Sequence, residues 1–396
     1  MKHIKRAIVL GGGGSKGSYQ IGAWKALRSL NIDYDIVTGT SIGAFNGALM
    51  VQGDYEKALE LWQDIDIDKV MINGLNLRTD LNYYIEHKDK LLPFIKSYRD
   101  NKGMDITPLK TLLNAYVDEQ KFFNSSVDYG LVSVKIPSFQ PCQKRKSSMT
   151  KKNLKLWILA SASCFPAFPI CEIGDEGYID GGYYDNLPID FAWQLGAQDV
   201  IAIALNPKPH KYSKHPLVQC IQPKEHLGGM LDFDKSTMSA NITLGYLDTL
   251  KSFGKLMGRD FSFHICEMSA YIRAFRLSLT SLLQSELLAY EDTLTSSLQK
   301  ALEFLTPEGF WASTPLSDKV MNLLDSHHIE ECLLTLVESQ MQHFDALQIY
   351  HLPEVLAQIQ RHYTSPLEIK AFSQYAQNDK LLLEAFFRIF LQHIDI

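Results

Sequence analysis

The residues best suited to chemistry in this chain lie at positions 39–43, which read Gly-Thr-Ser-Ile-Gly. The pattern Gly-x-Ser-x-Gly is typical of a nucleophile elbow, a sharp turn between a strand and a helix that exposes the serine hydroxyl. An extended run at 34–38 precedes it, and a helix of small residues follows it. Gly39 and Gly43 lack the Cβ atoms that would clash in such a turn. The pattern therefore predicts a nucleophilic Ser41; the alternative is a tight turn whose serine caps the helix.

A glycine-rich loop follows the first apolar run of the chain, residues 6–10. The backbone N–H groups of consecutive glycines can converge on an oxyanion, which favours the loop as an anion cradle. The alternative is a dinucleotide-binding loop, which requires an acidic residue at the end of the second strand. Asp33 and Asp35 lie instead at the start of that strand, so this alternative lacks its second requirement.

A serine nucleophile needs a base, which is normally a histidine. None of the 12 histidines has a suitable setting; His210 and His215, for example, fall in a loop rich in proline and lysine. Asp180 is followed by two glycines, and an ionised carboxylate can take the serine proton directly. We therefore expect Asp180 to be the base, the alternative being that Asp-Gly-Gly is a plain turn.

Together these motifs resemble those of the patatin-like phospholipases, a family of serine lipid acyl hydrolases that use a Ser–Asp dyad. The family's oxyanion loop matches residues 12–17, its nucleophile elbow matches 39–43, and its Asp-Gly-Gly motif matches 180–182. The stretches 160–169 and 185–188 also resemble the family. The resemblance extends over roughly residues 5–255.

The resemblance implies a three-layer α/β/α fold with a central, mostly parallel sheet, and it places the nucleophile at Ser41 and the base at Asp180. The implied oxyanion donors are the backbone amides of Gly12, Gly13, Gly14 and Ile42. The implied supporting residues are Lys16, Gly17, Gly39, Gly43, Gly181, Gly182 and Asn186. No metal or cofactor is implied.

The reaction implied is hydrolysis of fatty-acyl esters of phospholipids or other lipids through an acyl-enzyme. Activity is expected to fall toward the pKa of Asp180, ~4 for an unperturbed aspartate. The alternative function is a catalytically silent or partner-activated lipid-binding protein of the same fold.

The chain has 396 residues, more than the roughly 250–300 that one core usually supports. We expect a catalytic domain at 1–256 and a helical C-terminal region of unknown role at 257–396. The net charge of −6 argues against nucleic acid as a partner. The scattered cysteines and the short N-terminal apolar run predict a leaderless cytoplasmic protein. The resemblance implies a lipid substrate, met at a membrane or micelle surface.

Three features are candidates for contact with lipid or a protein partner. Six positive charges fall within residues 144–155, which predicts either a solvated hairpin or a foothold on anionic headgroups. Phe165 and Phe168 either line an acyl pocket or belong to the core. The apolar helix at 381–396 either packs on other helices of its region or binds a partner or a membrane.

Overall fold

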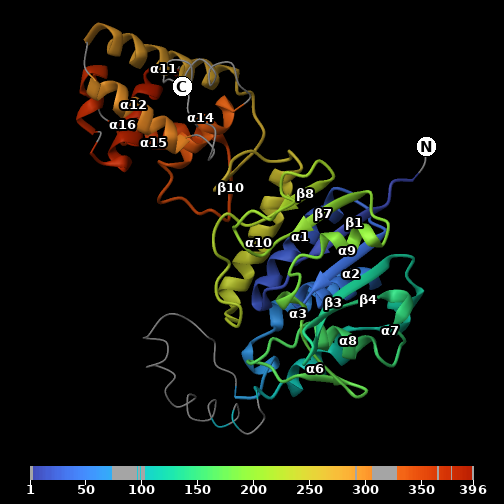
Figure 1. Cartoon of the computed structure of the whole chain (residues 1–396). Coiled ribbons are helices and arrows are strands. Elements are labelled where there is room, and N and C mark those ends of the chain that lie inside the picture. The colour runs from blue at the N-terminus through green and yellow to red at the C-terminus, as the bar shows by residue number, and fades with distance from the viewer. Residues whose placement is uncertain are drawn as a thin grey trace. The chain divides into compact units, whose positions relative to one another are not determined.

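A computed structural model describes residues 3–73, 96, 99, 103–289, 292–305, 328–363, 365–375 and 377–394. The chain divides into two compact units, Met1–Ser252 and Phe253–Ile396 (Figure 1). Much of the helical periodicity predicted between residues 55 and 116 falls at 74–102, where only positions 96 and 99 are described.

The first unit is built on an eight-stranded sheet with the order β5-β6-β3-β2-β1-β7-β8, in which β4 also pairs with β3. Its strands are β1 (Arg6–Leu10), β2 (Ile36–Thr40), β3 (Asp128–Ile136), β4 (Gln140–Arg145), β5 (Cys171–Ile173), β6 (Glu176–Asp180), β7 (Asp199–Ile203) and β8 (Val218–Ile221). Strands β3, β2, β1, β7 and β8 are parallel, while β4, β5 and β6 are antiparallel to their neighbours. The prediction of a central, mostly parallel sheet is confirmed.

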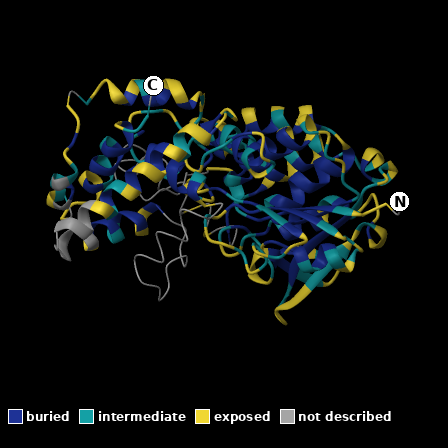
Figure 2. Ribbon diagram, turned by 90° about the horizontal axis from the view of Figure 1, so that it is seen from above, coloured by how far each residue is buried: buried dark blue, intermediate teal, exposed yellow. Residues whose placement is uncertain are grey.

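Helices cover this sheet on both faces. They are α1 (Ser18–Ser29), α2 (Ile42–Gln52), α3 (Tyr55–Asp64), α6 (Thr107–Tyr116), α7 (Glu119–Asn124), α8 (Leu154–Ser161), α9 (Ile189–Gln194) and α10 (Lys235–Ser252), with short 3₁₀ turns η1 (Gly14–Gly17), η2 (Ile67–Lys69), η3 (Lys146–Ser148) and η4 (Gly181–Tyr183). Successive strand residues point to opposite faces. Ala7 and Val9 therefore pack in the cluster that includes Ala192 of α9, while Leu10 lies against α2 at Gly47. The residues at these contacts on both faces of the sheet are buried (Figure 2).

The second unit is mainly helical. It contains α11 (Ser269–Ala289), α12 (Asp292–Leu305), α14 (Ile329–Glu338), α15 (Leu352–Gln360) and α16 (Asp379–Leu391), the turn η5 (Ile369–Tyr375), and a two-stranded pair of β9 (Ser262–Phe263) and β10 (Ile349–Tyr350). Phe386 and Phe390 of α16 are fully buried and pack on Phe275 of α11. The apolar C-terminal helix therefore packs within its own unit. No helix in the described part of either unit has the length and apolar character needed to span a bilayer.

Candidate active site

Strand β3 brings Ser41 and Asp180 together. Thr40, the last residue of β2, pairs with Val132 of β3, while Asp180, the last residue of β6, pairs with the adjacent Ser133. Because β2 runs parallel to β3 and β6 runs antiparallel to it, the ends of the two strands meet there. The register of three strands thus places residues that are far apart in sequence next to each other.

Ser41 adopts the backbone geometry of a strained turn. Its φ of 57° and ψ of −126° are rare for a residue with a Cβ atom, and such conformations cost ~1–3 kcal/mol. The flanking glycines allow close backbone approach: a Cβ at Gly43 would lie 2.3 Å from the Leu10 carbonyl oxygen, and one at Gly39 would lie 2.3 Å from the Gly43 carbonyl oxygen. The turn therefore depends on glycine at both positions.

Asp180 is 6% exposed and accepts a hydrogen bond from the Gly182 amide at 2.7 Å. Burial, which disfavours the charged form, raises the pKa of Asp180 to about 6, and hydrogen bonds from the Ser41 hydroxyl and the Gly182 amide oppose this rise. The pKa of ~4 quoted for an unperturbed aspartate therefore does not apply here, and the packed surroundings that raise it cannot be seen in the sequence. At neutral pH the group is mostly ionised and holds the serine hydroxyl.

The glycine-rich loop lies against the nucleophile. A Cβ at Gly12 would come within 3.0 Å of the Ser41 Cβ atom. The Gly12 amide already donates to the Asn186 carbonyl oxygen at 3.1 Å, so the prediction of Gly12 as an oxyanion donor was wrong. Among the hydrogen bonds of the described residues, none uses the backbone amides of Gly13, Gly14 or Ile42.

Polar side chains hold this loop in place from behind. The Gln20 amide donates to the Gly11 carbonyl oxygen at 2.7 Å, and the Asn46 amide donates to the Gly17 carbonyl oxygen at 3.0 Å. Trp62 Nε1 donates to Asn46 Oδ1 at 2.9 Å. The Gln20, Asn46 and Trp62 side chains are buried, and buried polar groups keep their hydrogen-bond partners. These hydrogen bonds therefore hold the loop carbonyl groups in position. The loop is therefore a rigid part of the core.

Asn186 links the glycine loop to the turn that carries Asp180. Its side-chain amide donates to the Gly12 carbonyl oxygen at 3.2 Å, and its Oδ1 atom would lie 3.1 Å from a Cβ at Gly182. Gly181 lies close to the backbone of β3, because a Cβ at this position would be 2.2 Å from the Val132 carbonyl oxygen. The predicted supporting residues of the two motifs thus meet in space.

The other two supporting residues of the loop, Lys16 and Gly17, lie at the end of η1, just before α1. Burial lowers the pKa of Lys16. Gly17 lies under the Ile42 side chain, which would be 2.7 Å from a Cβ at that position.

The end of α8 carries a contact that the sequence analysis missed. Ser161 Oγ accepts a hydrogen bond from the Ser41 amide at 2.9 Å and donates to the Val132 carbonyl oxygen at 2.6 Å. Two residues on, the Ser163 carbonyl oxygen accepts from the Asp180 amide at 2.8 Å. One short segment therefore fixes the backbone of both site residues. The available signal was a pair of serines at the end of an apolar helix.

An apolar cavity of about 50 Å³ includes Ser41 and Phe168 in its lining. Phe168 is 5% exposed, whereas Phe165 is 41% exposed and does not line this cavity. The two predicted pocket residues therefore have different surroundings, and only Phe168 faces the space beside the serine.

Most of the basic segment at 144–155 is engaged within the protein. The Lys146 ammonium donates to the carbonyl oxygens of Ser125 and Val127 at 2.7 and 2.8 Å, and Lys155 pairs with Glu119 at 2.7 Å. Lys144 lies over the Trp157 ring, 4.3 Å from its centroid. These charges are structural, which argues against a foothold on lipid headgroups.

Histidine is not a neighbour of the serine among the described residues. His210 lies instead beside Tyr212, with its rings 5.6 Å apart, and its pKa is lowered mainly by burial. The Asp180 carboxylate interacts with the Ser41 hydroxyl and accepts a hydrogen bond from the Gly182 amide.

Comparisons with known proteins show what the chain is similar to. The model of the patatin-like phospholipase family matches residues 8–193. The chain is 29% identical over 205 residues to patatin-like phospholipase domain-containing protein 7 of Rattus norvegicus, which covers 50% of this chain and 13% of that protein. It is 29% identical over 200 residues to lysophospholipase nte1 of Aspergillus terreus, which covers 50% of this chain and 12% of that protein.

These relatives are much longer than this chain, which spans about an eighth of their length. Among solved structures, the crystal structure of VipD from Legionella pneumophila aligns with a TM-score of 0.42 and 12% identity, over 98% of this chain and 90% of that one.

Proposed function

We propose that this chain, whose residues 8–193 match the model of the patatin-like phospholipase family, hydrolyses fatty-acyl esters of lipids with Ser41 as nucleophile and Asp180 as base. The substrate class follows from the family and from the apolar cavity beside the serine. The observation that carries the proposal is the position of Ser41 and the buried Asp180 at the adjoining ends of β2 and β6, where the Ser41 hydroxyl lowers the pKa of the carboxyl group.

In the first step, Ser41 Oγ bonds to the ester carbonyl carbon while its proton moves to Asp180. The tetrahedral intermediate then collapses, and the alcohol leaves with the proton from Asp180. In the second step, water attacks the acyl-enzyme and gives its proton to Asp180, which returns it to Ser41 Oγ as the fatty acid departs. A base that contacts the nucleophile directly needs no histidine between them.

The developing oxyanion is held by the backbone amides of Gly13, Gly14 and Ile42. These amides stand at the glycine loop and at the first residue of α2, where helix N–H groups have no partner in the helix. The support for this assignment is that the amide hydrogen bonds of the described residues leave all three unused. Gly12 instead fixes the loop through Asn186.

The test is labelling with a fluorophosphonate probe together with fatty-acid release from mixed phospholipid vesicles. We expect the wild type to label and release fatty acid, Ser41→Ala to do neither, and Asp180→Asn to lose turnover at least a thousandfold. His210→Gln is the matched control and should keep wild-type activity, since His210 lies outside the site.

An active Asp180→Asn variant would refute the role of the base. Absence of labelling in the wild type would favour the lipid-binding protein without turnover. Labelling without release would favour activation by a partner, for which the helical unit 253–396 is the candidate binding region.

A further inference from the structure

The cavity beside Ser41 is too small for a long acyl chain. Its volume is about 50 Å³, and one water-sized group needs ~10–15 Å³ of such space. The cavity therefore holds roughly four methylene-sized groups. A chain of fatty-acid length needs further apolar space.

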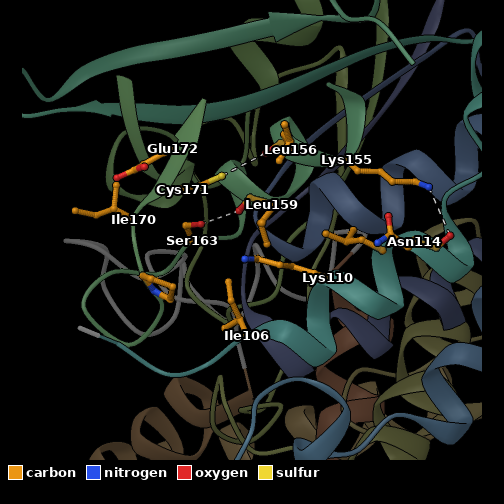
Figure 3. A pocket seen from close by; sticks show the side chains of 12 residues that line it. Ile106, Lys110, Asn114, Lys155, Leu156, Leu159, Ser163, Ile170, Cys171 and Glu172 are labelled. Carbon is orange, nitrogen blue, oxygen red and sulfur yellow. Dashed lines mark hydrogen bonds between the residues drawn. The ribbon is translucent and has the colours of Figure 1, made fainter. Parts of the chain in front are cut away.

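A second, larger cavity of about 420 Å³ lies in the same unit between α6, α8 and the loop before β5 (Figure 3). Its volume falls in the range of small-molecule sites, ~300–1,000 Å³. Its apolar lining consists of Ile106, Leu113, Leu156, Leu159, Pro169 and Ile170. This cavity is called the groove below.

Neighbouring residues of the same two segments line the groove and the Ser41 cavity. On α8, Ile158 lines the Ser41 cavity and Leu159 the groove; on the loop, Phe168 lines the first and Pro169 the second. Leu113 of α6 lines both. It is 3% exposed and is the one described residue common to the two linings. Leucine side chains occupy alternative staggered rotamers, so Leu113 is the candidate for a side chain whose rotation would open one space to the other.

We propose that the groove receives the distal part of a long acyl chain whose ester lies at Ser41, with Leu113 as the gate between the two spaces. This inference rests on the proposed function and adds a determinant of chain length to it. The occupant follows from continuity with the Ser41 cavity and from the apolar lining.

The polar groups at the groove fit an apolar occupant. Lys155 and Asn114 also line the groove, but the Lys155 ammonium is engaged by the Asn114 carbonyl oxygen at 3.5 Å and by Glu119 at 2.7 Å. Lys110 is exposed and extends from α6 into the groove (Figure 3), where its methylene stem offers apolar surface. Glu172, at the same cavity, is exposed to water. Ser163 Oγ donates to the Leu159 carbonyl oxygen at 2.9 Å, which leaves no demand for a polar ligand there.

The test compares p-nitrophenyl esters of 4 to 16 carbons, using the ratio of kcat/KM for the longest ester to that for the shortest. Leu156→Trp fills the groove from a side chain that is already 42% exposed, so it tolerates substitution. We expect this ratio to fall at least about tenfold, because each excluded methylene is worth roughly that much. Leu113→Trp, which closes the gate, should lower the ratio as well.

Leu217→Trp is the matched control, since Leu217 is 51% exposed and lines neither cavity. Its chain-length ratio should equal that of the wild type. Chain-length ratios that stay unchanged in both Leu156→Trp and Leu113→Trp would overturn the proposal while leaving the hydrolase intact.

Binding of the fluorescent 18-carbon fatty acid cis-parinaric acid, measured with Ser41→Ala protein, separates the groove from the chemistry. We expect Leu156→Trp in that background to weaken binding about tenfold, and palmitate to displace the probe far better than butyrate. Equal affinity with and without Leu156→Trp would overturn the groove assignment. A wild type that binds the probe but cleaves no ester would overturn the proposed function alone.

Discussion

Replacement of Asp180 by asparagine should abolish turnover and, at the same time, stabilise the fold. The pKa of this carboxyl is raised from 3.8 to about 6, chiefly by burial. A raised carboxyl pKa means that the native state favours the protonated form, so the stability that this group contributes is present below the unfolded pKa and is lost as pH rises through about 6. Asparagine stays neutral at every pH and avoids that loss.

The magnitude follows from the pKa difference. One pKa unit corresponds to ~1.4 kcal/mol, so the change from 3.8 to about 6 gives roughly 3 kcal/mol as an upper bound at pH 8. At pH 5 part of the native carboxyl population is protonated, which restores part of the wild-type stability. The difference in free energy of unfolding between variant and wild type then falls to roughly 1.5 kcal/mol. Asparagine Oδ1 can still accept the Gly182 amide, so the local structure is retained.

Urea unfolding at pH 8 and pH 5 measures these free energies of unfolding. Tryptophan fluorescence suits the assay, because four of the five tryptophans (Trp24, Trp62, Trp157 and Trp193) belong to the first unit. Asp190→Asn is the control of opposite sign: hydrogen bonds from Tyr212 and Lys211 help to lower the pKa of Asp190, so its loss should destabilise the protein at pH 8. An Asp180→Asn variant that is less stable than the wild type at pH 8 would refute the reasoning.

Three further outcomes follow from the site. Ester hydrolysis should lose activity tenfold per pH unit below about pH 6, because Asp180 must be ionised to accept a proton; an acid limb centred near pH 4 in the kcat/KM profile would contradict this. Ser161→Ala should cost ~1–3 kcal/mol in stability, measured by urea unfolding, because it leaves the Ser41 amide without its acceptor; a neutral variant would show that the bond is dispensable. Gly14→Ala should abolish fluorophosphonate labelling, because φ is +59° and the Met230 carbonyl oxygen would lie 2.0 Å from the new Cβ, whereas Gly53→Ala, with φ of +76° and open space, should label normally.

The sequence was sufficient to predict the local elements around the serine. Small residues and glycines at 39–48 favour a strand, a turn and a helix in succession, and α2 begins at Ile42 as expected. The strand before it was predicted at 34–38 but spans Ile36–Thr40. Its end is set by pairing with β1 and β3, and such long-range partners cannot be identified from a local pattern.

The sequence was insufficient wherever distant residues decide the chemistry. The Gly12 amide is occupied by Asn186, 174 residues away, and the Ser41 amide is held by Ser161, 120 residues away. The pKa of Asp180 depends on burial that only the folded sheet provides. Leu113 follows the periodicity of an ordinary buried helix position, and its place between two cavities is visible only in space.

The site gathers several features that are unfavourable for folding. Ser41 has a strained backbone, and Asp180 is a buried carboxylate. The amides of Gly13, Gly14 and Ile42 have no partner among the hydrogen bonds of the described residues. Strand β3 brings them together, because its pairing with β2 and β6 joins the two chain segments at adjacent residues. Hydrogen bonds along β3, whose residues 129–134 are buried, and apolar packing around it therefore offset the strain and the desolvation at the site. Substitutions that relieve either cost should make the first unit more stable and less active, since the same strain and burial present the hydroxyl to an ester and keep its base in contact with it.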